Sequence, residues 1–161
     1  KAPWYFVGLQ ELLLHVHPLC AILVIPATLI LALIGVAYLP YDRTSTGRWF
    51  LTAKGRRMSA VAAATAMVFT TAWILVDEWV VDPAGWLPGS APLVSDGLLP
   101  FAVLLAGVTA FYMSLKKYFS ATLSETVQAM FVLFAVSFTV LTVIGVWFRG
   151  AGMALMWPWQ I

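Results

Sequence analysis

The sequence predicts an all-α membrane protein with four transmembrane helices, preceded by a short interfacial helix on the outer side. Two observations indicate this class. Of the 161 residues, 62% are apolar and only 10% are charged, whereas about 25% are charged in an average soluble domain. The chain also contains four long apolar stretches without Asp, Glu, Lys, Arg or His. This composition excludes a soluble enzyme and a basic protein that binds nucleic acid.

Each apolar stretch is close to the length that a helix needs to cross the hydrocarbon core, roughly 20 residues. Pro26 lies inside the first stretch and Pro100 near the start of the third. Membrane helices tolerate proline where neighbouring groups satisfy the freed carbonyls. The predicted spans are Leu19–Leu39, Met58–Val76, Leu98–Leu115 and Val127–Phe148.

Charge in the loops predicts the direction of the spans, because cytoplasmic loops carry an excess of Lys and Arg. The loops before the second and fourth spans are basic, and the loop before the third contains acids but no Lys or Arg. We therefore expect the N-terminal segment, the acidic loop and the C-terminal tail on the outer side. The basic residues are Arg43, Arg48, Lys54, Arg56, Arg57, Lys116 and Lys117, against Asp42 and Glu125; the acidic loop holds Asp77, Glu78, Asp82 and Asp96.

The run 47–57 combines basic residues with the rings of Trp49 and Phe50. Such a run is typical of a cytoplasmic anchor at the membrane interface. A second hypothesis is that it binds an anionic lipid headgroup.

The segment from Trp4 to Val16 is apolar but too short to span. It predicts a short helix that lies at the outer interface or packs against other helices. Its only acid, Glu11, is surrounded by leucines, where a carboxylate is costly unless it is paired or protonated. One hypothesis is a raised pKa that makes Glu11 a proton acceptor near neutral pH. The alternative is a position at the wet edge of the segment, or a salt bridge to another subunit.

The two histidines, His15 and His17, are also in this part of the chain. Two residues apart, they would point to different faces of a helix. They are either water-facing interfacial residues, or one of them contributes to a proton path or meets a partner, because imidazole titrates near neutral pH. No span contains a histidine, and Cys20 is the single cysteine. We therefore expect no haem ligation and no metal site in this chain.

The stretch Ala2-Pro3-Trp4-Tyr5-Phe6 resembles the Pro-Glu-Trp-Tyr-Phe loop in the C-terminal half of cytochrome b, including subunit IV of the photosynthetic cytochrome bf complex. In that family a short apolar helix, a proline and a span follow the loop, and the same order follows here. The resemblance covers residues 1–78, and Gly8-Leu9-Gln10-Glu11-Leu12 looks closest to bacterial menaquinol-oxidising members. Residues 79–161 would add an outer loop, two further spans and an outer C-terminal tail.

This resemblance implies a membrane subunit of a quinol-oxidising complex in the bacterial cytoplasmic membrane, with menaquinol as the expected substrate. Haem b is expected in a partner chain similar to the N-terminal half of cytochrome b. Iron–sulfur subunits, cytochrome c subunits or both would accept the electrons. The chain would then be a subunit of the enzyme that ligates no haem itself.

In the family the loop lines the quinol-oxidation site, which assigns Pro3, Trp4, Tyr5 and Phe6 to quinol binding. The family's tyrosine positions the quinol and its glutamate takes a proton. Here Pro3 occupies the position of that glutamate, so Glu11 is the candidate replacement. Tyr5 and Glu11 are the candidate catalytic residues, with His15 as the candidate for the proton path. The alternative is a structural membrane anchor with a degenerate quinol site, which Pro3 favours.

Overall fold

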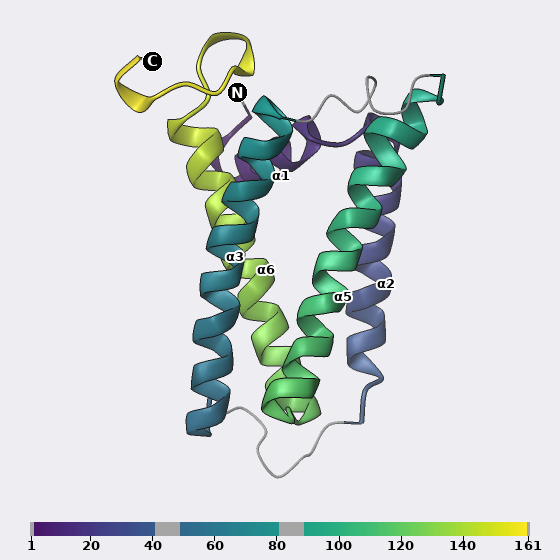
Figure 1. Cartoon of the computed structure of the whole chain (residues 1–161), viewed down its shortest axis with the longest axis vertical. Helices are drawn as coiled ribbons and strands as arrows, with labels where there is room; N and C mark the ends of the chain where they lie inside the picture. Colours follow the sequence, from purple (N-terminus) through teal and green to yellow (C-terminus); the bar gives the residue numbers. More distant parts are fainter. Residues whose placement is uncertain (1, 41–48, 81–88, 161) are drawn as a thin grey trace.

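The computed structural model describes residues 2–40, 49–80 and 89–160, and this part of the chain is built from helices. Asp42, Arg43, Arg48 and Asp82, which entered the loop charges, lie outside the described residues. The long helices stand side by side, and the short helix α1 lies across one end of them, here called the α1 end (Figure 1). The helices are α1 (Trp4–Leu14), α2 (Ile25–Ala37), α3 (Ala53–Trp79), α5 (Leu99–Phe119) and α6 (Leu123–Trp147).

Four described segments are long and apolar enough to cross a membrane, which confirms the predicted class of multi-pass helical protein. A short helix precedes them, also as predicted. The segments are Cys20–Ala37, Ala53–Trp79, Val94–Phe119 and Leu123–Trp147.

The second and fourth spans begin four or five residues earlier than their apolar stretches. Thr52 caps α3, because its side chain accepts a hydrogen bond from the Gly55 amide at 2.8 Å. Thr122 and Glu125 form a capping box at the start of α6. Polar residues at these positions satisfy free amides of the first turn. A prediction based on apolar length therefore missed the polar first turns.

The first and third spans both open with a π-helical turn, η1 (Cys20–Val24) and η3 (Val94–Leu98). Each turn is followed by a proline at the second position of the next helix, Pro26 in α2 and Pro100 in α5. A proline ring clashes with the carbonyl four residues earlier and leaves it without its donor. The wider turn accommodates that ring, so each span continues past its proline.

These two turns meet at the α1 end. The amide of His17 donates to the carbonyl of Asp96 at 2.7 Å. Gly97 lies against Cys20, and a Cβ at that glycine would be 2.9 Å from the sulfur. This contact joins the start of the first span to the start of the third.

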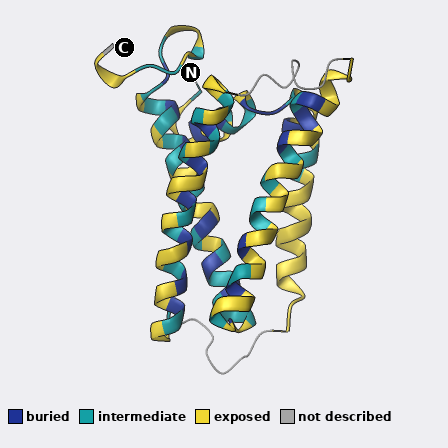
Figure 2. Cartoon of the chain, viewed as in Figure 1, coloured by how far each residue is buried: buried dark blue, intermediate teal, exposed yellow. Residues whose placement is uncertain are grey.

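The core lies mainly between α3 and α6, which pack along much of their length. Small residues such as Ala62, Ala66 and Ala129 are buried there and let the two backbones approach. Thr70 donates from its hydroxyl to Ser137 at 3.0 Å across the same interface. By contrast, α2 has no buried residue, and it is exposed from residue 27 to its end (Figure 2).

Where α1 crosses α6, each helix has a glycine at the contact. A Cβ added at Gly8 of α1 would lie less than 3.0 Å from the Thr142 hydroxyl of α6. A Cβ added at Gly145 of α6 would lie equally close to Val7 of α1. Because neither position has room for a side chain, the glycines set the close crossing of the two helices.

Replacing Gly145 by leucine should therefore destabilise the protein. The expected loss in the free energy of unfolding is about 1–3 kcal/mol, as for other overpacked sites. Denaturant titration in detergent micelles measures it. Gly35→Leu in α2 is the matched control, because a Cβ at Gly35 has nothing within 4 Å; equal losses in the two variants would contradict the tight crossing.

Candidate functional site

Five charged or titratable side chains gather at the α1 end and are called the ion cluster here. Glu11 comes from α1 and His15 from the residue after it, Asp77 and Glu78 from the last turn of α3, and Arg149 from two residues beyond α6. Glu11 is 0%, Arg149 1% and His15 6% exposed. Charged groups as deeply buried as these require partners, because leaving water is costly for an ion.

Arg149 is the centre of the cluster. Its Nε lies 3.0 Å from both carboxylate oxygens of Glu11, and its Nη2 donates to Oε1 of Glu11 at 2.6 Å. Its Nη1 donates to Glu78 at 2.7 Å and to the carbonyl of Met153 at 2.9 Å. The planar guanidinium fork suits this two-pronged pairing with a carboxylate. One side chain thus holds α1, the end of α3 and the C-terminal tail together.

The tail reaches Arg149 because the chain folds back after α6. The amide of Gly150 donates to Ala154 at 3.0 Å, and that of Met156 donates to Phe148 at 2.8 Å. Gly152 has a φ of 68°, which glycine adopts readily. This turn brings the Met153 carbonyl onto the guanidinium.

His15 lies between two carboxylates. Its Nδ1 is 2.5 Å from Oδ2 of Asp77, and its Nε2 is 3.4 Å from Oε1 of Glu11. Burial by itself would lower the pKa of His15, but the hydrogen bonds to Asp77 and Glu11 and their negative charges raise it to about 9. The imidazole is therefore protonated at neutral pH. The Nη2 of Arg149 lies 3.4 Å from Nε2 of His15. When the ring is protonated, both of these nitrogens are donors, so they form no hydrogen bond with each other.

Three expectations from the sequence need correction here. The pKa of Glu11 is not raised: burial acts in that direction, but the bonds and charges of His15 and Arg149 outweigh it and hold the pKa below 4.5. The partner of Glu11 is Arg149 of the same chain, so no second subunit is needed for a salt bridge. His15 is buried, so the water-facing alternative is wrong for this residue.

The predicted quinol-binding residues lie on another part of α1. Trp4, Tyr5 and Phe6 are 75%, 56% and 52% exposed, and we call them the aromatic edge. The Tyr5 ring is 5.8 Å from that of Trp4 and 5.2 Å from that of Phe6, between centroids. Pro3 precedes them as the N-cap of α1. The structure therefore brings Pro3 to Phe6 together at the exposed start of α1, whereas Glu11 is buried further along the same helix.

Three members of the ion cluster were not recognised as site residues from the sequence. Asp77 and Glu78 entered only as loop charges that orient the spans, and Arg149 is the one basic residue after Lys1 that falls on the side expected to be outer. The sequence did contain a signal for this pairing. The acids Asp77 and Glu78 follow the second span and the base Arg149 follows the fourth, and both of these span ends are expected on the outer side. Among the described residues, no group of three or more His, Cys, Asp or Glu is arranged to hold a metal ion.

Comparison of the chain with protein-family models, with curated proteins and with solved structures finds no match.

Arg149→Met should destabilise the protein by about 3–5 kcal/mol, because it leaves Glu11 buried without its counter-charge. The double variant Glu11→Gln/Arg149→Met should recover part of this loss. Both are measured by denaturant titration in micelles. Arg57→Met, at an exposed position near the start of α3, should change stability by less than about 0.5 kcal/mol. A loss in Arg149→Met no larger than in Arg57→Met would show that the cluster does not stabilise the fold.

Stability should also fall at alkaline pH. The pKa of His15 is about 9 in the folded protein and 6.5 as its ordinary value. Its contribution is therefore complete below pH 6.5 and disappears as the pH rises towards 9. The shift corresponds to roughly 3 kcal/mol. Unfolding free energies measured from pH 6 to 9.5 should show this fall, and His15→Gln should remove most of it. A wild-type profile that is flat over this interval would contradict the pairing of His15 with Asp77.

Proposed function

We propose that the chain is a membrane subunit of a quinol-oxidising electron-transfer complex in the bacterial cytoplasmic membrane. The aromatic edge would form one wall of a pocket for the quinol, with menaquinol as the expected substrate. The observation that carries this proposal is the exposure of three adjacent rings on a helix whose one acid, Glu11, is turned inward. The resemblance of residues 2–6 to the quinol-site loop of cytochrome b supports the same assignment.

The polarity of α1 is the reverse of that of a surface helix in water. Its buried face contains the carboxylate of Glu11, and its exposed face is apolar. An exposed apolar face suits lipid, a partner or an apolar ligand. Aromatic rings offer flat surfaces to a quinol ring, and the Tyr5 hydroxyl provides a polar group that can bond a quinol oxygen. The exposed apolar residues of α1 are Trp4, Tyr5, Phe6, Leu9 and Leu14.

One wall does not make a pocket, so the proposal requires other subunits. A haem b-bearing chain similar to the N-terminal half of cytochrome b would complete the site and take electrons onward. Iron–sulfur subunits, cytochrome c subunits or both would follow. The unburied surface of α2 gives such a partner a large apolar face to pack against. In this arrangement the chain binds and orients the quinol and excludes water from it.

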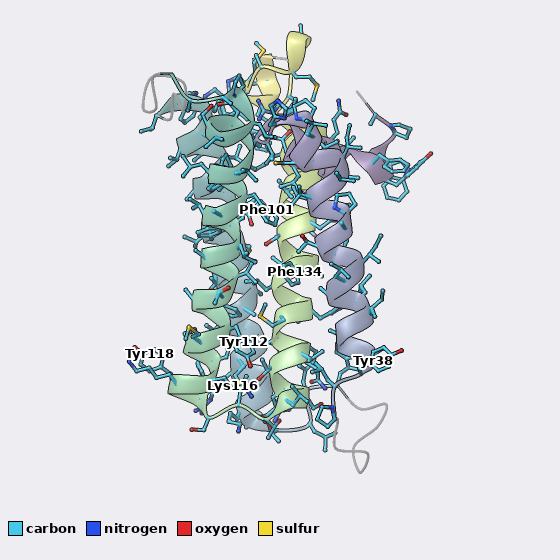
Figure 3. The ribbon with its side chains drawn as sticks, turned by 90° about the vertical axis from the view of Figure 1, so that its right-hand side faces the viewer. Tyr38, Phe101, Tyr112, Lys116, Tyr118 and Phe134 are labelled. Atoms are coloured by element: carbon cyan, nitrogen blue, oxygen red, sulfur yellow. The ribbon has the colours of Figure 1, made fainter. Side chains whose placement is uncertain are left out.

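The charge distribution supports an outward-facing α1 end. Lys54, Arg56 and Arg57 begin α3 and Lys116 and Lys117 end α5. Lys116 lies, with Tyr38 and Tyr118, at the end of the bundle opposite α1 (Figure 3). Positive residues favour the cytoplasmic side. The quinol pocket would then open on the outer side, which is where protons from an oxidised quinol would be released.

The alternative function, a structural anchor with a degenerate quinol site, is favoured by a different observation. Glu11 is fully engaged by Arg149 and has a lowered pKa, so it is a poor acceptor for a quinol proton. Pro3 at the family's acid position leaves no carboxylate beside Tyr5. The two functions differ in whether the aromatic edge binds a quinol.

Tyr5→Ala should weaken binding of a menaquinone analogue to the assembled complex about threefold to tenfold, the loss expected for one aromatic contact. Equilibrium titration of the complex in nanodiscs measures this affinity, and Tyr5→Phe separates the ring from the hydroxyl. Tyr118→Ala, at an exposed position at the opposite end, is the control and should leave affinity unchanged. Unchanged affinity in both Tyr5→Ala and Trp4→Ala would favour the structural anchor.

A further inference from the structure

The ion cluster contains more carboxylates than permanent cations. Glu11, Asp77 and Glu78 face it from α1 and α3, and Arg149 is its only guanidinium. Arg149 is shared between Glu11 and Glu78, and the ion pair of Asp77 in the described structure is with His15. With a neutral imidazole, three negative charges would face one positive charge in a site of low dielectric. A proton on His15 removes one unit of this imbalance, so the charge count favours a bound proton.

The hydrogen-bond geometry is compatible with this proton. Nδ1 of His15 faces Oδ2 of Asp77, and Nε2 lies 3.4 Å from Oε1 of Glu11. Nε2 also lies 3.4 Å from Nη2 of Arg149, a donor that a neutral ring could accept from. The protonated ring can donate to both carboxylates, so the excess of carboxylates over permanent cations decides in favour of the imidazolium.

Among the described side chains that face the His15 ring, that of Asp77 is the one in partial contact with solvent. The Glu11 side chain is 0% exposed and that of His15 2%, whereas the Asp77 side chain is 24% exposed. From the neighbouring turn η3, Asp96 meets this region through its carbonyl, which accepts from His17. A proton on the ring therefore has one partly exposed neighbour, the Asp77 carboxylate, through which it can reach water at the α1 end.

We propose that His15 and Asp77 form a proton-binding site that is occupied at neutral pH and exchanges its proton with the aqueous phase at the α1 end. In one exchange, the proton on Nδ1 passes to Oδ2 of Asp77 and from there to water. The vacated Nδ1 then takes a replacement proton from water through Asp77, while Nε2 keeps its proton and no electron is transferred. Imidazole suits this role because it titrates near neutral pH and its surroundings shift that titration. This site stands independently of the proposed function.

The chain offers a clean test of occupancy because it has only two histidines. In the His17→Gln variant, ¹⁵N-histidine NMR of the chain in nanodiscs reports on His15 alone. The ring should be an imidazolium at pH 7 and titrate near pH 9. Asp77→Asn should lower the titration midpoint by at least one pH unit, a tenfold loss of proton affinity, and Asp77→Glu should restore most of it. Asp96→Asn is the control and should leave the midpoint in place.

A neutral His15 at pH 7 in the His17→Gln protein would overturn the proposal without any further variant. Equal midpoints in Asp77→Asn and Asp96→Asn would overturn it as well. A second measurement is the rate at which the Nδ1 proton exchanges with water, taken from the same NMR spectra. Asp77→Asn should slow this exchange at least threefold relative to Asp96→Asn; an unchanged exchange rate would also overturn the proposal. A complex that binds no quinone analogue would remove the proposed function, and the NMR titration would still decide the proton site.

Discussion

The pairing of Arg149 with Glu11 is the interaction on which the α1 end depends. A carboxylate and a guanidinium that are both almost completely buried are tolerable only together. The same guanidinium also binds Glu78 and the carbonyl of Met153, so it fixes three segments that are distant in the sequence. The position of α1, and with it the position of the aromatic edge, follows from this single side chain and from the two glycines at the crossing with α6.

The reversed polarity of α1 connects this interaction to function. Because the polar face of α1 is satisfied inside the protein, its apolar face is free to meet lipid, a partner or a quinol. A helix with Glu11 turned outward would place a charge in the layer where the aromatic rings lie. The internal ion cluster is therefore what makes an apolar outer face compatible with a stable short helix. The same arrangement places His15 beside Asp77 and creates a buried site that favours a protonated imidazole.

The long helices could be predicted from the sequence because apolar length alone determines a membrane span. Their true starts could not, since Thr52 and Thr122 begin helices through hydrogen bonds of polar side chains and not through hydropathy. The aromatic edge was recognisable as a local pattern. The ion cluster was not, because its central contact joins residues 138 positions apart, and no local pattern pairs Glu11 with Arg149. The pKa of Glu11 was expected to rise for the same reason: burial could be foreseen, but the counter-charge that outweighs it could not.

The crossing of α1 with α6 has a consequence for biogenesis. A chain is synthesised from its N-terminus, so α1 leaves the ribosome before α6, and Arg149 follows 138 positions after Glu11. Until then Glu11 lacks its counter-charge and α1 lacks its close contact at Gly145 of α6. The helix α1 is thus made before α6 but can dock only after α6 has been inserted. Removing residues 149–161 would remove Arg149 while leaving the four spans intact, and would yield a membrane-inserted protein in which α1 is not anchored.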